Sequence, residues 1–93
     1  MTKFTVALLQ LLPGSTPEET MKKGISACRQ AKAAGADIAL FPEMWNCGYR
    51  IPEDIGQLKA AAVPVDGAFV QTFGALAAEL DMAIAITFLE QYE

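Results

Sequence analysis

The sequence predicts an α/β fold, in which a β-α-β-α-β unit builds a mainly parallel sheet. Three short apolar segments have the length and composition of buried strands. Two longer segments between them repeat their apolar residues with helical spacing, so strand-like and helix-like segments alternate along the chain. Because parallel neighbours need a crossover connection, this alternation favours helices packed on a parallel sheet through right-handed crossovers.

The first strand and the start of the first helix carry strong local signals. Phe4–Gln10 is an apolar and β-branched run bounded by Pro13, which predicts a buried strand. Thr16 is the expected N-cap of the helix, Pro17 suits the first helical position, and Glu19 stands three residues after the cap, as in a capping box. The helix is therefore expected to begin directly after Thr16.

The first helix has one apolar stripe and a glycine at its end. Gly35 is the expected C-cap, in a left-handed conformation. The stripe follows the spacing i, i+4, i+7 and i+11, and consists of Met21, Ile25, Cys28 and the stem of Lys32. This spacing predicts that one face of the helix packs against the sheet.

The remainder of the chain repeats the pattern. Asp37–Phe41 is the expected second strand, and Pro42–Pro64 is expected to be mostly loop. Asp66 is the expected N-cap of the second helix, and Met82–Leu89 is the expected third strand. The stripe of the second helix is Phe69, Phe73, Leu76 and Leu80.

Side-chain size alternates along the strands, and this alternation predicts two unlike sheet faces. One parity holds large residues: Phe4, Val6, Leu8, Ile38, Leu40, Ile84, Ile86 and Phe88. The other holds mainly small ones: Thr5, Ala7, Ala39, Ala83, Ala85 and Thr87, with Leu9 and Phe41 as exceptions. We expect the large face to pack on the helices and the small face to meet a further layer. The alternative is that the alanines fill tight spots under helices.

Composition excludes several classes of function. The chain has 93 residues, enough for one small domain at most, with seven Lys and Arg against eleven Asp and Glu. This acidic balance argues against binding to a phosphate backbone. The absence of His excludes Ser-His-Asp and Cys-His catalysis within these residues and leaves no obvious metal site. The two Cys do not form a disulfide framework, and no apolar run is long enough to span a membrane, so we expect a cytoplasmic protein with reduced thiols.

One carboxylate stands where ligands bind in parallel sheets. Glu43 follows the second strand directly, and ligands of α/β sheets bind beyond the carboxyl ends of the strands. Pro42 restricts the backbone before Glu43, while Trp45 and Tyr49 can exclude water beside it. These features would suit a proton-transfer role, but taken alone they favour an ordinary solvated loop carboxylate, because loops carry many carboxylates.

The chain resembles the N-terminal third of the nitrilase, or carbon–nitrogen hydrolase, superfamily, and the resemblance covers essentially all 93 residues. It rests on the first strand, the end of the first helix, the Phe-Pro-Glu signature and the flanks of the second helix and third strand: Val6–Gln10, Gly35–Asp37, Phe41–Glu43, Gly48–Tyr49, Val65–Gly67 and Phe88–Glu90. The tripeptide is a weak signal by itself, whereas its place after the second strand in this ordered context is fairly specific.

The resemblance implies a hydrolase with a Glu-Lys-Cys mechanism on an α-β-β-α four-layer sandwich. A Cys thiol attacks an amide, nitrile or N-carbamoyl carbon, a Glu accepts the thiol proton, and a Lys stabilises the developing negative charge. Of these three residues only Glu43 maps onto this sequence, as the general base. The Lys and Cys are expected beyond residue 93, so residues 1–93 form the N-terminal portion of an incomplete domain that is inactive alone.

The resemblance also bears on ligands and partners. It implies a small-molecule substrate and a homo-oligomer for the full-length protein, with no cofactor and no metal. Trp45, Asn46 and Tyr49 are candidates for the lining of the substrate pocket, although Trp45 and Tyr49 could equally anchor the loop to the body of the domain. Cys28 belongs to a helix stripe and is expected to be core, and Cys47 is expected to be packing or pocket wall.

Two alternative functions belong to other classes. The first is a non-catalytic interaction module that binds a partner through the small-residue sheet face. The second is a nucleotide-binding domain, which is disfavoured because the loop Leu11–Ser15 after the first strand lacks a glycine-rich phosphate cradle.

Overall fold

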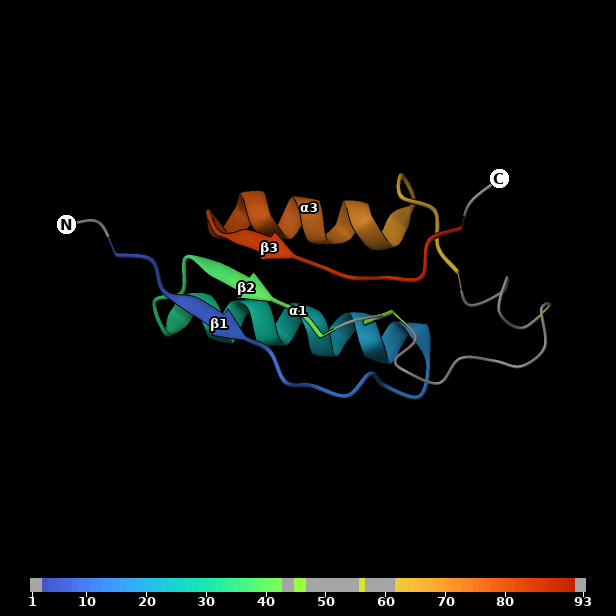
Figure 1. Ribbon diagram of the computed structural model, residues 1–93, viewed down its shortest axis with the longest axis horizontal. Helices are drawn as coiled ribbons and strands as arrows, with labels where there is room; N and C mark the ends of the chain where they lie inside the picture. The colour runs from blue at the N-terminus through green and yellow to red at the C-terminus, as the bar shows by residue number, and fades with distance from the viewer. Residues whose placement is uncertain (1–2, 43–44, 47–55, 57–61, 92–93) are drawn as a thin grey trace.

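The computed structural model describes residues 3–42, 45–46, 56 and 62–91, and it has the predicted β-α-β-α-β order. Three strands pair in parallel in the order β1-β2-β3, and the two helices run along the sheet antiparallel to the strands (Figure 1). The elements are β1 (Val6–Leu8), α1 (Pro17–Ala33), β2 (Ile38–Leu40), α3 (Ala68–Leu80) and β3 (Ala83–Ala85). Neither α1 nor α3 is long and apolar enough to cross a membrane.

The strands are shorter than the apolar runs that predict them. β1 keeps only the middle of Phe4–Gln10, although the Leu9 amide still donates to Leu40 O at 2.9 Å. β3 keeps only Ala83–Ala85 of the expected Met82–Leu89, because the chain after β3 pairs with irregular segments instead of a strand. One of these segments forms a single parallel bridge between Val63 and Glu90.

The start of α1 confirms the capping prediction. Thr16 is the N-cap, and its Oγ1 accepts a hydrogen bond from the Glu19 amide at 3.1 Å. The Glu19 carboxylate reaches back to Ser15, accepting from the hydroxyl at 2.6 Å and from the amide at 2.9 Å. The bonds from Ser15 lower the pKa of Glu19, so the ionised carboxylate stabilises this end of the helix at neutral pH.

The end of α1 confirms the predicted left-handed conformation of Gly35, although the C-cap is Ala34 and Gly35 is the residue after it. Gly35 has φ +93, in the left-handed region that favours glycine, and the Ala36 amide donates to Ala31 O at 3.0 Å. This six-residue closure is a Schellman motif. The prediction for α3 is wrong by one residue: the N-cap is Gly67, whose amide donates to Pro64 O at 3.0 Å in a turn, and Asp66 contributes only its carbonyl to Gln71 Nε2.

The buried face of α1 differs from the expected stripe. Its buried residues are Thr20, Gly24, Cys28 and Ala31, whereas Met21 and Ile25 are half-buried at its margin and Lys32 is exposed. The reason is that α1 lies against large aromatic side chains, which only small residues on the helix can approach closely. The α3 stripe is confirmed, with Phe69, Phe73 and Leu76 buried and Leu80 half-buried.

The core joins both helices to one face of the sheet. Five aromatic rings form a chain of four contacts across it, with centroids 5.2 Å apart for Phe41–Trp45, 5.3 Å for Phe41–Phe73, 5.3 Å for Phe69–Phe73 and 6.0 Å for Phe69–Phe88. On the outer side of the helices, an exposed Arg29–Glu79 ion pair links α1 to α3, and this pairing lowers the pKa of Glu79 and raises that of Arg29.

The predicted assignment of the sheet faces is wrong for β1 and β2. Ala39 is completely buried and Ala7 packs on the core, so the small residues of these strands lie under the helices. Val6, Leu8 and Leu40 are 47%, 65% and 40% exposed on the opposite face. Helices approach a sheet closely where its residues are small. The structure therefore agrees with the alternative interpretation, in which the alanines of these strands fill tight spots under the helices.

β3 reverses this arrangement. The register places Ile84 beside Ala39, on the helix side, and Ala85 beside Leu40, on the open side. A small strand residue in the middle of the sheet is thus compensated by a large one on its neighbour. Within the described residues, the face that holds Val6, Leu8 and Leu40 has no covering layer.

The close packing of α1 gives a first testable prediction, based on two mid-helix glycines. A Cβ on Gly24 would lie 2.7 Å from Phe73 Cζ and 3.0 Å from Trp45 Nε1, whereas a Cβ on Gly74 would meet nothing within 4 Å. Overpacking costs about 1–3 kcal/mol, and replacing Gly by Ala in a helix gains about 1 kcal/mol. Gly24→Ala should therefore lower the free energy of unfolding by about 1 kcal/mol, while Gly74→Ala should raise it by a similar amount. Urea unfolding of both variants measures this, and an equal gain in both would contradict the packing around Gly24.

Candidate functional site

The candidate site lies at the carboxyl ends of β1 and β2, where the chain leaves the sheet. Phe41 continues β2 by one residue, because its amide donates to Ala85 O at 3.0 Å, and its ring is buried. Pro42 follows at the edge and is half-buried. Glu43, Cys47 and Tyr49 lie outside the described residues, so the role predicted for each of them stays a prediction.

The described residues on either side of Glu43 are held by the same partner. The Thr87 hydroxyl donates to Pro42 O, and Thr87 Oγ1 and Thr87 O each accept from the Trp45 amide at 3.2 Å. Thr87 follows β3, so the loop after β2 is tied to the chain that leaves the neighbouring strand. These contacts anchor the segment that carries the Phe-Pro-Glu signature at the carboxyl edge of the sheet.

Trp45 is placed in the core. Its side chain is 1% exposed, it stacks at a tilt against Phe41, and Gly24 makes room for its Nε1. No described residue accepts a hydrogen bond from that Nε1. These contacts give Trp45 an anchoring role, and the cavity described next is not lined by it.

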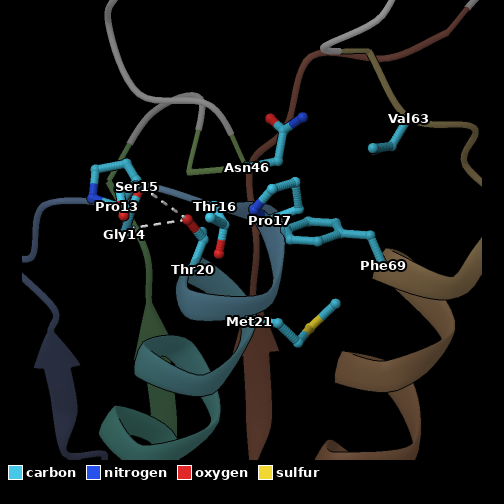
Figure 2. A pocket seen from close by; sticks show the side chains of 10 residues that line it. All are labelled: Pro13, Gly14, Ser15, Thr16, Pro17, Thr20, Met21, Asn46, Val63 and Phe69. Carbon is cyan, nitrogen blue, oxygen red and sulfur yellow. Dashed lines mark hydrogen bonds between the residues drawn. The ribbon is translucent and has the colours of Figure 1, made fainter.

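Asn46 lies at the mouth of a cavity. Its side-chain Oδ1 accepts a hydrogen bond from the Leu89 amide at 2.7 Å, which fixes the orientation of the amide group. The cavity has a volume of about 440 Å³ and lies between the start of α1, the start of α3 and the loops after β1 and β2 (Figure 2). It is lined by Pro13, Gly14, Ser15, Thr16, Pro17, Thr20, Met21, Asn46, Val63 and Phe69.

The chemistry of this cavity follows from its lining. Met21, Phe69 and Val63 supply apolar walls, and Asn46 and Ser15 supply polar groups. Thr20 is committed to structure, since its Oγ1 accepts from the Gly14 amide at 2.9 Å. None of the described lining residues is ionisable, so the cavity suits an uncharged part of a ligand and requires its acid–base chemistry from elsewhere.

A second, more open hollow of about 540 Å³ lies on the other side of Pro42. It is lined by Leu8, Leu9, Gln10, Leu11, Leu12, Leu40, Phe41 and Pro42. Its walls are continuous with the open sheet face. The loop after β2 therefore borders an apolar hollow on each side.

The described residues supply no reactive thiol for this site. Cys28 is completely buried, and burial raises its pKa to about 11, so the thiol stays protonated at neutral pH. This burial confirms the predicted packing role of Cys28. Each described Lys is exposed; Lys23 donates to Leu12 O at 2.6 Å, and Lys32 lies beside Asp81 O. Across residues 3–42, 45–46, 56 and 62–91, no three His, Cys, Asp or Glu side chains come together as a metal site.

Thr87 is the functional candidate that the sequence does not reveal. In the sequence it falls on the same side as Ala83 and Ala85, the side of small residues, so nothing distinguishes it from an ordinary packing residue. No local sequence signal marks it, because its two partners, Pro42 O and the Trp45 amide, lie 45 and 42 residues away along the chain.

Comparisons with known proteins identify the family of this chain. The family model described as carbon–nitrogen hydrolase matches residues 5–93. An aliphatic nitrilase of Sinorhizobium fredii is 31% identical over 107 aligned residues, which cover 98% of this chain and 35% of that protein.

Two glutamine-dependent NAD(+) synthetases are also similar. The protein of Thermotoga maritima is 31% identical over 94 residues, covering 100% of this chain and 16% of its own length. The protein of Synechocystis is 45% identical over 53 residues, covering 56% of this chain and 9% of its own length. The chain thus spans about a third or less of the length of these curated relatives. The match to the family model, over nearly the whole chain, shows that the chain belongs to the carbon–nitrogen hydrolase family.

Proposed function

We propose that these residues supply the general base of a hydrolase that cleaves an amide, nitrile or N-carbamoyl carbon–nitrogen bond. The observation that carries the proposal is the family match through the Phe41–Glu43 signature, at a point where Pro42 and Trp45 are both tied to Thr87 at the carboxyl edge of the sheet. Glu43 is the proposed base. Trp45 is proposed to hold the loop, and Asn46 and Tyr49 are proposed to border the substrate.

The proposed reaction proceeds through a covalent intermediate. For an amide, the Glu43 carboxylate accepts the proton of a Cys thiol as the sulfur attacks the carbonyl carbon, and a Lys ammonium stabilises the developing oxyanion. Glu43 then returns the proton to the leaving nitrogen, ammonia departs, and a thioester remains. Glu43 next deprotonates water, which attacks the thioester to release the acid and restore the thiol. A nitrile would form a thioimidate by the same first attack.

The proposal places the Lys and the Cys outside these 93 residues, because the described Lys side chains are exposed and Cys28 is buried and protonated. Residues 1–93 are then the N-terminal portion of a larger domain and are inactive alone. The open sheet face supports this interpretation, since it exposes Val6, Leu8 and Leu40 to whatever layer completes the domain. A reduced thiol nucleophile fits a cytoplasmic location, and the resemblance carries the proposal of a homo-oligomer.

The substrate class is proposed from the relatives and from the cavity. The names of the relatives point to a nitrile and to the amide of glutamine. Both offer a carbon–nitrogen bond to a thiol nucleophile. The uncharged, largely apolar lining beside Asn46 fits the non-reacting part of a small molecule.

Ammonia release from the full-length polypeptide tests this function. We expect ammonia from at least one of four probes, namely glutamine, an aliphatic amide, an aliphatic nitrile and an N-carbamoyl amino acid. Prior alkylation of the protein with iodoacetamide should abolish the release, because the nucleophile is a thiol. Folded protein that releases no ammonia from any probe, or that remains fully active after complete alkylation, would contradict the proposal.

The alternative of a non-catalytic module has less support, because the helices cover part of the small-residue face on which it depends. The structure buries Ala39 and packs Ala7 under the helices. The accessible face carries the large residues Val6, Leu8 and Leu40, and its only contribution from β3 in this register is small, at Ala83 and Ala85.

A further inference from the structure

The hydrogen bonds between the segments that leave β2 and β3 change their spacing at Thr87. In the regular part, the Ala83 amide donates to Asp37 O at 3.0 Å and the Phe41 amide donates to Ala85 O at 3.0 Å. An uninterrupted parallel ladder would next pair Thr87 O with the amide two residues after Phe41. Thr87 O is instead paired with the amide of Trp45, four residues after Phe41. The segment that leaves β2 therefore has two more residues between these bonds than the segment that leaves β3. Such an insertion is a β-bulge, a feature common at sheet edges and next to active sites.

The Thr87 hydroxyl is the group that closes this interruption. It donates to Pro42 O, on one side of the extra residues, and its oxygen accepts from the Trp45 amide at 3.2 Å, on the other side. Thr87 is half-buried, so both contacts are partly protected from water. One hydroxyl thus fixes both ends of the short segment that contains Glu43.

We propose that Thr87 is a positioning residue for the catalytic carboxylate, acting through Pro42 and Trp45. This inference rests on the proposed function, because it assumes that Glu43 is the base. The geometric argument is that Glu43 is bonded directly to Pro42, and one residue separates it from Trp45. Thr87 thus holds the Pro42 carbonyl and the Trp45 amide, the backbone groups on the two sides of Glu43. General-base catalysis depends on such placement, and a misplacement of about 1 Å can cost on the order of 10²-fold in rate.

The contacts predict that the hydroxyl, more than the size of the side chain, is needed. Thr87→Val keeps a β-branched side chain and removes the donor to Pro42 O, whereas Thr87→Ser keeps the donor and removes a methyl group. Thr5→Val is a matched control, since Thr5 is exposed beside β1 and bonds its neighbours only through its backbone. The experiment measures kcat and KM for ammonia release by the full-length protein, together with its Tm.

The expected result is a fall in kcat of about tenfold or more for Thr87→Val, with KM within about threefold, because substrate binding is kept and the base is misplaced. Thr87→Ser should retain most of the activity, and Thr5→Val should be indistinguishable from the wild type. Thr87→Ala serves as a second variant without the hydroxyl and should reproduce the loss in kcat.

Several outcomes would overturn the inference. One is a Thr87→Val protein with unchanged kcat, and another is a Thr87→Ser protein as slow as Thr87→Val. If both variants without the hydroxyl fail to fold, Thr87 has a purely structural role and the inference is likewise rejected. The Glu43→Gln variant distinguishes failure of the proposed function from failure of this inference. An active Glu43→Gln protein rejects the proposed function. An inactive Glu43→Gln protein together with a fully active Thr87→Val protein rejects only the role of Thr87.

Discussion

Replacing Glu43 with Gln should reduce the kcat of the full-length protein by about 10²–10⁴-fold, the range expected for loss of a general acid–base group. Gln has nearly the same shape as Glu and cannot accept a proton. The loss should appear in both halves of the reaction, because the same carboxylate accepts the thiol proton and later activates water. Rapid mixing with substrate should therefore show no burst of ammonia.

Glu18→Gln is the matched control for this substitution. Glu18 is exposed in the first turn of α1 and does not line the cavity beside Asn46, and its replacement by Gln removes the same charge. Both variants should keep the Tm of the wild type to within a few degrees. A Glu43→Gln protein with more than a tenth of wild-type kcat would show that Glu43 is not the base, whereas loss of activity in Glu18→Gln would indicate an effect of net charge.

The order of elements could be predicted because its signals are local. The capping of α1 by Thr16 and Glu19 and its termination at Gly35 depend on residues within a few positions of one another. The stripe of α3 was also readable, since its large apolar residues are the ones that become buried. In each case the side chain that makes the contact is visible in the sequence at the spacing that the element requires.

The packing of the layers could not be predicted because its causes are non-local. Gly24 and Thr20 lie at the centre of the buried face of α1, and neither is apolar enough to mark a stripe. Gly24 is buried against Phe73 and Trp45, which approach from other parts of the chain, and Thr20 Oγ1 is bonded to the Gly14 amide. The same close approach places Ala39 under the helices and turns Leu40 outward, so size alternation along a strand identified two faces and assigned them wrongly.

The same distinction between local and non-local causes applies to the candidate site. Glu43 could be proposed from the sequence because it adjoins a strand end and belongs to a family signature. Thr87 could not be proposed from the sequence. Its importance comes from a register shift between two segments of the chain, and the bonded residues Trp45 and Thr87 are 42 positions apart. A hydroxyl group that bonds backbone atoms far away along the chain has no sequence pattern of its own.

Phe73→Ala should lower the free energy of unfolding by about 3–5 kcal/mol, the cost typical of removing a buried Phe. The Phe73 side chain is 1% exposed, and its ring contacts Phe41 and Phe69 with centroids 5.3 Å away in both cases. Removing it takes the middle ring out of the aromatic chain that joins α3 to β2. Urea unfolding measures the loss, and Val65→Ala, at an exposed position, should change stability by no more than about 0.5 kcal/mol.

A double-mutant cycle with Gly24 tests whether this ring is the reason that α1 needs a glycine. The closest atom to a Cβ on Gly24 is Phe73 Cζ, at 2.7 Å, so the cost of Gly24→Ala should disappear once Phe73 is Ala. Trp45 Nε1, at 3.0 Å, is the nearest atom of another residue and would remain. If Gly24→Ala destabilises the Phe73→Ala protein as much as it destabilises the wild type, the two positions are not coupled. In that case the shifted stripe of α1 has another cause than the packing of Phe73.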